Sequence, residues 1–254
     1  SKKMKIATII PTLNRPAFLE KAILSISRQK LKPNEVFIID NNKEKNTNYN
    51  LFIKLKKKTN LNLIYVKNHG SIQSLRNDTV FKTNCEIISF LDDDDQWHET
   101  YLNKSLEIFK SKKVKAIYTS MQVIDLNEKK LSEINLEEDY DIKKLLVFNP
   151  GFFHSNLIIY KNTFLDLNGF QSNSGASDKD FFIKLKNNNV HFFINSERLV
   201  YRCDHEYQWS KDYKKMSADK ALFLQKNFRK LNFFEIHQSL KNIIKFYLKY
   251  LKSL

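Results

Sequence analysis

The chain has 254 residues, 42% of them hydrophobic, and its 43 Lys and Arg residues outnumber its 28 Asp and Glu residues, for a formal net charge of +15. This length suits one large α/β domain or two small ones with a sizeable core, and only four Gly and four Pro argue against long disordered linkers and collagen-like chains. The positive charge favours anionic partners such as nucleotides, nucleic acid or an anionic membrane surface.

The first half of the chain predicts strands and helices in alternation. In chain order these are a strand at 5–10, a helix at 17–29, a strand at 35–39, a helix at 48–59, a strand at 62–66, a helix at 74–81 and a strand at 86–91. The prediction depends on β-branched runs and on apolar residues at helical spacing. Such alternation favours right-handed crossovers and a mainly parallel sheet, in which ligands bind beyond the carboxyl ends of the strands.

The second half predicts more varied elements. These are a helix at 101–109, a strand at 115–121, an acidic loop or hairpin at 127–141, a strand at 156–160, a turn at 168–170, a helix at 178–187, strands at 192–194 and 199–201, and then helices. No internal repeat is evident.

The tail, residues 206–254, contains eleven Lys and Arg residues and four Asp and Glu residues. One helical face near its end is apolar and is flanked by lysines; its members are Ile236, Leu240, Ile244, Tyr247 and Leu251. We favour an interpretation in which this stripe packs on the rest of the chain while the lysines are solvated. The alternative is a helix that lies on a membrane surface.

The cysteines and the lack of long apolar stretches allow a prediction of the cellular compartment. Cys85 and Cys203 lie far apart and outside any C-x-x-C or Cys/His metal spacing, so neither a zinc site nor a disulfide framework is expected. No stretch approaches the roughly 18 apolar residues of a membrane span, and the first residues lack the apolar region of a signal peptide. We expect a cytoplasmic protein, with peripheral attachment to the inner face of the plasma membrane as a variant.

Four consecutive aspartates, residues 92–95, follow the predicted strand at 86–91. A run of like charge is usually a solvated face, but several carboxylates at a strand end repel one another unless a cation neutralises them. Asp92 and Asp94, two residues apart on an extended turn, can point to the same side and suit a divalent ion with oxygen ligands. Mg²⁺ or Mn²⁺ bound in this way completes its shell with substrate phosphates, which indicates a nucleoside diphosphate or its ester.

Other strand ends offer partners for such a ligand. Thr12, Asn14 and Asp40 could bind a base and ribose, and Arg76 adds a cation near a helix start. Each also has a simpler interpretation: Asn14 could cap a helix, Asp40 could form a turn, and Arg76 could be a solvated helix residue.

Taken together, four ordered motifs resemble the family 2 glycosyltransferases of the GT-A fold. The motifs are IIPTLNRP at 9–16, EVFIIDNN at 35–42, GSIQSLRN at 70–77 and FLDDDDQW at 90–97. The resemblance implies an α/β GT-A fold with a Rossmann-like, mainly parallel central sheet flanked by helices, and a helical C-terminal extension. It further implies a catalytic domain at 1–205, with a donor half at 1–110 and an acceptor half at 111–205, before the basic amphipathic extension at 206–254.

The resemblance also assigns roles to individual residues. Asp40 would contact the base, typically uracil, and Arg76 the base or the phosphates. Asp92 would lie on the ribose side, Asp94 would hold the metal, and Asp95 would lie near the sugar hydroxyls. The complete set for the nucleotide sugar is Pro11, Thr12, Asn14, Arg15, Asp40, Asn42, Arg76, Asp92, Asp93 and Asp95, and the set for the metal is Asp94 and His205.

Three further residues have competing interpretations. His205 could be a structural histidine instead of a metal ligand. His154 lies where relatives line the acceptor pocket, although we favour a core or surface role. Trp97 we interpret as a packing residue behind the aspartates.

The catalytic base is expected in the second half, after the turn at 168–170. The segment ASDKDFFIKL at 176–185 resembles the acidic motif of the family and assigns the base to Asp178, with Asp180 as the second candidate. The family usually has an aromatic residue where Lys179 stands and Glu where Ser177 stands. The alternative is that Asp178 caps the following helix.

The resemblance therefore implies an inverting transferase that uses a divalent metal, Mn²⁺ or Mg²⁺, and a UDP-hexose or UDP-N-acetylhexosamine donor. The acceptor would be a hydroxyl of a glycan or glycolipid in bacterial surface polysaccharide, lipooligosaccharide or lipid-linked oligosaccharide synthesis. Alternatives are a nucleotidyltransferase, a non-catalytic nucleotide-sugar-binding protein and a nucleic-acid-binding protein. Residues 11–14 are not a Gly-rich basic phosphate loop and no nucleic-acid module is recognisable, so nucleic acid is not an expected partner.

Overall fold

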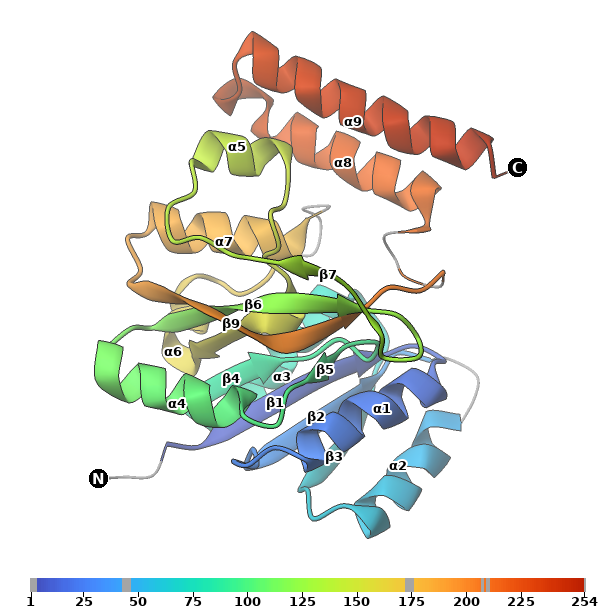
Figure 1. Cartoon of the computed structure of the whole chain (residues 1–254), viewed down its shortest axis with the longest axis vertical. Coiled ribbons are helices and arrows are strands. Elements are labelled where there is room, and N and C mark those ends of the chain that lie inside the picture. The colour runs from blue at the N-terminus through green and yellow to red at the C-terminus, as the bar shows by residue number, and fades with distance from the viewer. Residues whose placement is uncertain (1–3, 43–46, 172–175, 207, 209–210, 254) are drawn as a thin grey trace.

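The computed structural model describes residues 4–42, 47–171, 176–206, 208 and 211–253. It consists of a central sheet with helices on both faces and a pair of helices at the C-terminal end (Figure 1).

The described strands form a nine-stranded sheet, in the order β3-β2-β1-β4-β8-β6-β9-β5 with β7 paired to β6. The strands are β1 (Ile6–Thr12), β2 (Glu35–Asp40), β3 (Leu63–Lys67), β4 (Ile87–Phe90), β5 (Gln96–Trp97), β6 (Ala116–Ile124), β7 (Lys130–Ile134), β8 (Leu157–Tyr160) and β9 (Phe192–Cys203). Strands β1 to β4 pair in parallel, which confirms the prediction for the first half. Strand β8 runs antiparallel to both β4 and β6, so the whole sheet is mixed.

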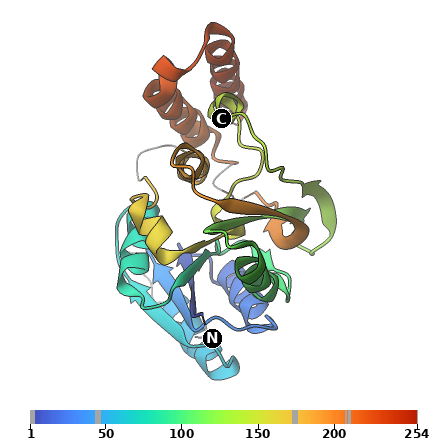
Figure 2. The ribbon, with the colours of Figure 1, turned by 90° about the vertical axis from the view of Figure 1, so that its left-hand side faces the viewer.

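The described helices cover both faces of this sheet. They are α1 (Pro16–Ser27), α2 (Thr47–Lys58), α3 (Ile72–Lys82), α4 (Tyr101–Lys112), α5 (Ile142–Val147), α6 (Lys161–Asp166), α7 (Ser177–Asn187), α8 (Tyr213–Asn227) and α9 (Phe233–Leu251). Helices α1, α2 and α4 pack on one face, and α3, α6 and α7 pack on the other. Figure 2 shows these layers from the side.

Strand β1 illustrates why the first half folds in this way. All seven of its residues are buried because it lies between β2 and β4 and is covered on both faces. Ile6 and Ile10 enter the core under α1, whereas Ala7 and Ile9 enter the core under α3, as the alternation of side chains along a strand requires. The strand continues two residues beyond the predicted end at residue 10 and includes Pro11, so that Thr12 lies beside Asp40 of β2.

Several local predictions need correction. Helix α3 begins at Ile72, two residues earlier than predicted, because the Ser71 side chain accepts a hydrogen bond from the Ser74 backbone N–H. The two strands predicted at 192–194 and 199–201 form the single strand β9, with an irregularity in its pairing to β6. The hairpin interpretation of residues 127–141 is confirmed, since β7 pairs antiparallel with β6.

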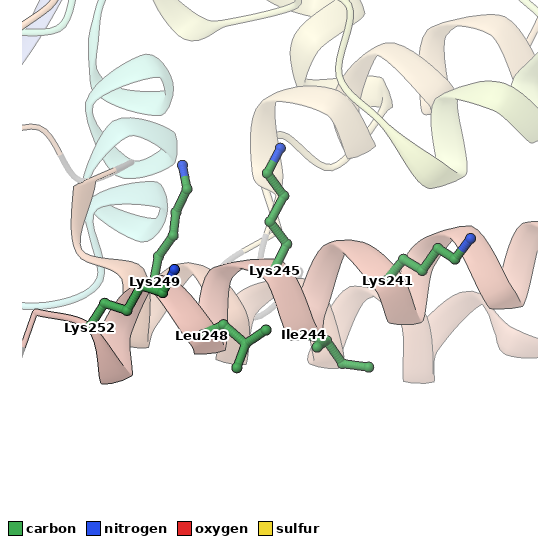
Figure 3. A pocket seen from close by; sticks show the side chains of 6 residues that line it. All are labelled: Lys241, Ile244, Lys245, Leu248, Lys249 and Lys252. Atoms are coloured by element: carbon green, nitrogen blue, oxygen red, sulfur yellow. The ribbon is translucent and has the colours of Figure 1, made fainter.

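The C-terminal helices stack in sequence on the rest of the molecule, with α8 between α7 and the outermost helix α9 (Figures 1 and 2). Phe223 of α8 lies in the same hydrophobic core as α7. The apolar stripe predicted to pack inward does not do so, because Leu240, Ile244, Tyr247 and Leu251 are exposed. Their position on α9 is outward, as Figure 3 shows for Ile244. Among the residues that the structure describes, no helix is both long enough and apolar enough to cross a membrane.

Candidate active site

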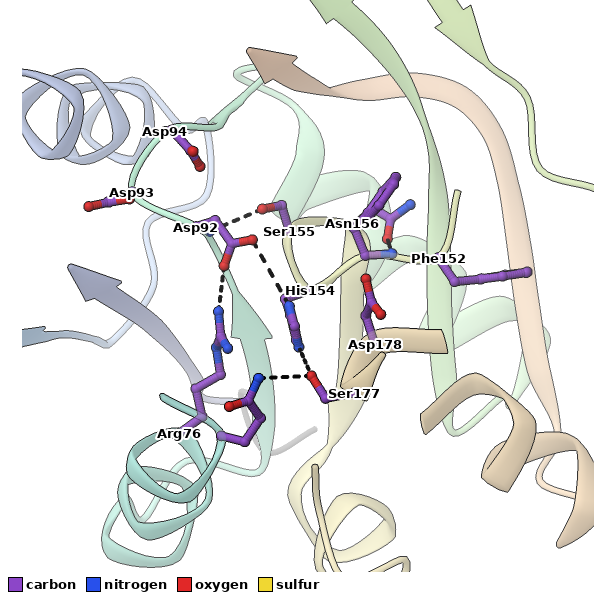
Figure 4. Close-up of polar contacts among 12 residues, drawn as sticks. Arg76, Asp92, Asp93, Asp94, Phe152, His154, Ser155, Asn156, Ser177 and Asp178 are labelled. Carbon is purple, nitrogen blue, oxygen red and sulfur yellow. Dashed lines mark hydrogen bonds and ion pairs between the residues drawn. The ribbon is translucent and has the colours of Figure 1, made fainter. Parts of the chain in front are cut away.

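The carboxyl ends of β1, β2 and β4 meet at one edge of the sheet, as predicted. Thr12 lies opposite Asp40 in the pairing of β1 with β2, and Ile9 lies opposite Phe90 in the pairing of β1 with β4. The turn that follows β4 therefore passes close to the end of β1. Its aspartates, residues 92–95, contact residues from other elements, and each carboxylate has a different environment; Figure 4 shows Asp92, Asp93 and Asp94 of this turn.

Asp93 connects this turn to the end of β1 and the start of α1 through a hydrogen bond and an ion pair. Its buried carboxylate accepts a 2.7 Å hydrogen bond from the Thr12 hydroxyl and forms an ion pair with Arg15. Burial raises the pKa of Asp93 to about 7, although the Arg15 guanidinium opposes the rise. Arg15 is also the N-cap residue of α1, and Asn14 before it is exposed with a φ of 52° and no capping role. The capping interpretation of Asn14 is therefore wrong.

Asp94 is held by side chains from two distant parts of the chain. Its Oδ2 accepts from Arg15 Nη1 at 2.9 Å and lies 3.1 Å from Nε2 of His205, which follows β9. Burial alone would raise the pKa of Asp94, but the hydrogen bond with His205 and the charge of Arg15 lower it below its usual value. The His205 ring stacks on Phe18 with 4.4 Å between centroids, which fixes its orientation.

Asp92 pairs with Arg76 of α3. The Arg76 Nη2 donates to Asp92 Oδ1 at 2.5 Å, and the Asp92 backbone N–H donates to the Ser155 hydroxyl at 3.0 Å. Arg76 is 3% exposed, so its interpretation as a solvated helix residue is wrong. Burial raises the pKa of Asp92 even though the charge of Arg76 opposes the rise, and burial lowers the pKa of Arg76.

Three of the four aspartates converge to form a set of hard oxygen donors. Oxygens of Asp92, Asp94 and Asp95 lie within 4.8 Å of one another. Asp95 is buried beside the end of β9, where it accepts from the Cys203 backbone N–H at 3.2 Å. Burial and the neighbouring carboxylates raise the pKa of Asp95 well above its usual value, which a cation would reverse. This donor chemistry fits Mg²⁺ or Mn²⁺.

The loop after β2 is organised by Asp40. One of its oxygens accepts from the Asn42 backbone N–H at 3.0 Å and from Asn48 Nδ2 at 3.1 Å, and the other accepts from the Tyr65 hydroxyl. The Asp40 side chain is fully buried. It thus fixes the turn, in agreement with the simpler of its two interpretations, and its predicted contact with a base stays a prediction.

Asp178 lies across the site, in the first turn of α7. It is partly buried, and its oxygens accept from the Lys179 backbone N–H at 2.7 Å and from Asn149 Nδ2 at 3.5 Å. Burial raises the pKa of Asp178 to about 6. The N-cap of α7 is Ala176, so the capping interpretation of Asp178 is wrong. Asp180 has a different environment, because Lys226 of α8 donates to it at 3.2 Å.

His154 connects the two sides of the site, and its place in an acceptor pocket stays a prediction. Its Nδ1 lies 4.0 Å from Asp92 Oδ2, and its Nε2 lies 3.2 Å from the Ser177 hydroxyl (Figure 4). Ser177 accepts a 3.0 Å hydrogen bond from Gln73 of α3. Burial lowers the pKa of His154 well below its usual value, so the ring is neutral. Sequence reasoning missed Gln73 entirely and treated Ser177 only as a departure from the family motif.

Two other residues near the site pack against aromatic rings. Trp97 is buried against Tyr101 with 4.5 Å between ring centroids, and its indole N–H donates to the Ser155 carbonyl at 2.8 Å, which confirms a packing role. Lys179 replaces the aromatic residue usual in the family and is itself buried, with its ammonium 4.0 Å from the ring centroid of Phe223. Burial lowers the pKa of Lys179 to about 8.

Comparison with known proteins agrees with this geometry. Residues 7–170 match the model of glycosyl transferase family 2. A Campylobacter jejuni protein, GalNAc(5)-diNAcBac-PP-undecaprenol beta-1,3-glucosyltransferase, is 25% identical over 204 residues, which cover 78% of this chain and 64% of that protein. An uncharacterized glycosyltransferase of Nostoc sp. is 26% identical over 136 residues, which cover 53% of this chain and 42% of that protein. The chain thus spans less than two thirds of the length of either relative.

Solved structures show the same fold at low identity. TarS of S. aureus in complex with UDP-GlcNAc matches with a TM-score of 0.65 and 18% identity, over 97% of this chain and 73% of that one. The mannosyltransferase PcManGT of Pyrobaculum calidifontis, in complex with GDP-Man and Mn²⁺, matches with a TM-score of 0.64 and 16% identity, over 90% of this chain and 65% of that one. With the family match extending over more than half of its length, this chain belongs to glycosyl transferase family 2 and has the GT-A fold that its motifs predicted.

Proposed function

We propose that this chain is an inverting glycosyltransferase that moves a sugar from a nucleotide-diphosphate sugar to a hydroxyl of a glycan or glycolipid. The observation that carries the proposal is the arrangement of acids on the two sides of His154. A cluster suited to a cation and a diphosphate lies on the donor side, and Asp178, a carboxylate with a pKa of about 6, lies on the acceptor side. The two partners of a transfer reaction would meet between them.

UDP is the proposed nucleotide. TarS, with the same fold, is named in complex with UDP-GlcNAc. The base and ribose would contact the strand ends and the residues around them, namely Pro11, Thr12, Asn14, Arg15, Asp40, Asn42, Arg76, Asp92, Asp93 and Asp95. Asp94 would hold a divalent ion with His205 beside it, and such an ion, when bound, neutralises charge on the departing diphosphate.

The chemistry that we assign to the chain itself centres on Asp178. Its carboxylate would accept the proton of the acceptor hydroxyl as that oxygen bonds to the anomeric carbon. The bond from this carbon to the diphosphate breaks on the opposite face, so the configuration inverts. A base with a pKa near 6 is ionised at neutral pH and still basic enough to take a proton. Asp180 is the weaker candidate because its carboxylate is paired with Lys226.

The proposed acceptor is a lipid-linked or surface glycan of a bacterium. The Campylobacter jejuni relative is named for an acceptor that is linked through a diphosphate to undecaprenol. We place the reaction in the cytoplasm, at the inner face of the plasma membrane, where a lipid-linked acceptor would be within reach.

Thermal stabilisation by nucleotides tests the donor assignment. UDP with Mn²⁺ at about 100 times its Kd should stabilise the fold by about 2.7 kcal/mol, which corresponds to about 5–10 °C in Tm for a chain of this size. ADP and GDP should stabilise less. Asp94→Asn should remove the part of the shift that needs Mn²⁺, whereas Asp78→Asn, at an exposed position on α3, should not. Stabilisation by none of the nucleotides, with or without metal, would exclude the donor assignment.

A further inference from the structure

Helix α9 has an apolar outer face. Leu240, Ile244, Leu248 and Leu251 lie on it and are between 44% and 54% exposed, and Tyr247 is 51% exposed. These residues fall within about a quarter of the helix circumference, since successive residues advance by roughly 100°. Because these half-exposed apolar side chains line up along a 19-residue helix, they form a continuous apolar surface. Isolated exposed apolar residues, in contrast, are common on protein surfaces.

The opposite face of α9 is already used to hold the helix in place. Ser239 is buried, and Phe246 packs against Tyr213 of α8 with 6.2 Å between ring centroids. Lys220 of α8 lies 4.9 Å from the centroid of the Phe246 ring. Helix α8 is in turn fixed to α7 by Phe223. The outer face is therefore held in a set orientation at the end of the molecule (Figure 1).

Lysines border one edge of this face. Lys241, Lys245 and Lys252 lie beside Ile244 and Leu248 along a shallow groove, which Figure 3 shows together with Lys249. Within α9 the only acidic residue is Glu235, and it completes the N-terminal cap instead of facing a lysine. The long lysine stems allow their ammonium groups to reach a polar layer while the neighbouring apolar side chains lie deeper.

We propose that the outer face of α9 binds the surface of an anionic lipid bilayer. Its apolar residues would enter the boundary between headgroups and acyl chains, and its lysines would contact anionic headgroups. Charge decides between this partner and a second copy of the chain. In a symmetric pair each lysine row would approach an identical row with no acidic residues to balance it, whereas a bilayer with anionic headgroups supplies the opposite charge. The inference concerns α9 alone and does not depend on the donor assignment.

Vesicle co-sedimentation of the full chain tests this inference. The chain should bind vesicles of phosphatidylcholine mixed with phosphatidylglycerol, bind phosphatidylcholine alone much less, and lose binding as salt is raised. Replacing Lys241, Lys245 and Lys252 by Gln should weaken binding about fivefold per lysine. The matched control replaces exposed lysines on other helices, Lys57, Lys58 and Lys110, and should have a much smaller effect.

The apolar part of the face is tested separately. Ile244→Ser combined with Leu248→Ser should weaken binding about tenfold or more, because each side chain loses most of its apolar area. Phe81→Ser, which changes an apolar residue that is 75% exposed on α3, is the control and should leave binding unchanged. Since all of these positions are exposed, the variants should keep their Tm and their stabilisation by UDP.

Two results would overturn the inference. One is equal vesicle binding by the wild type and by both α9 variants. The other is an absence of vesicle binding together with a dimer, seen by sedimentation velocity, that the Ile244 and Leu248 changes dissolve; a second copy would then cover the face. Because UDP stabilisation is measured on the same samples, neither result would be confused with failure of the proposed donor site.

Discussion

Replacing Asp178 by Asn gives the sharpest test of the proposed chemistry. The amide is close in size and can still accept from the Lys179 backbone N–H, as the carboxylate does at 2.7 Å, so the first turn of α7 should persist. It cannot accept a proton. General-base catalysis contributes about 10²–10⁴-fold, so kcat should fall by that factor while stabilisation by UDP stays near its wild-type value.

The pH dependence provides a second measure of the same group. A base must be deprotonated to act, and burial raises the pKa of Asp178 to about 6. With that pKa, about a tenth of the molecules carry the ionised carboxylate at pH 5 and nearly all do at pH 8. The rate should therefore rise about tenfold from pH 5 to a plateau above pH 7. The assay follows release of the nucleoside diphosphate at saturating donor and acceptor.

Asp180→Asn is the matched control, since it alters the other acid of the same helix turn. It removes the partner of Lys226 but leaves Asp178 unchanged, and kcat should change by less than a factor of about three. Full turnover by Asp178→Asn would remove Asp178 from the proposed role. If Asp180→Asn were inactive instead, the base would be the second acid. A rate that stays level from pH 5 to 8 would contradict the assigned pKa.

Three further predictions concern stability, each measured by urea unfolding. Arg76→Met should cost about 2 kcal/mol, because it leaves the carboxylate of Asp92 without its charged hydrogen bond; an unchanged midpoint would mean that solvent replaces this bond. Gly169→Ala should cost about 1–3 kcal/mol, because its φ is +54° and the added Cβ would lie 2.5 Å from Oδ1 of Asn77. Phe223→Ala should cost about 3 kcal/mol, since this ring is 4% exposed and joins α8 to the core, whereas a small effect would show that α8 is only loosely docked.

The fold of the first half of the chain could be predicted because the sequence signals for its strands and helices are local. Each strand of the first half is a short apolar run closed by polar residues, and parallel strands joined by helices bring those ends together. Thr12, Asp40 and Asp92 therefore reach one edge, as expected. The direction of β8 could not be predicted, since its three buried apolar residues, 157–159, give the same pattern in either direction. Helices α5 and α6, of six residues each, are too short to show a helical period.

The contacts around His154 were less predictable because they join distant segments. Gln73, His154 and Ser177 come from separate elements. Gln73 and Ser177 lie within the motifs at 70–77 and 176–185, but the sequence analysis assigns no site role to either of them. Arg76 is followed on α3 by the polar residues Asn77 and Asp78, so only the tertiary structure reveals that it is buried. The stripe on α9 was identified correctly, but which apolar residues face α8 depends on how the helix is rotated.

The four adjacent aspartates show how a chain with a net charge of +15 accommodates its densest negative segment. Arg76 pairs with Asp92, and Arg15 pairs with Asp93 and with Asp94, whose Oδ2 also meets His205. These partners come from α3, from the loop before α1 and from the end of β9, so neutralising the acids also ties these elements together. An incoming cation would share Asp94 with Arg15. If the cation displaced Arg15 from Asp94, the guanidinium of Arg15 would lie close to the diphosphate of a bound donor. Arg15 would then neutralise a carboxylate before the donor binds and the diphosphate afterwards.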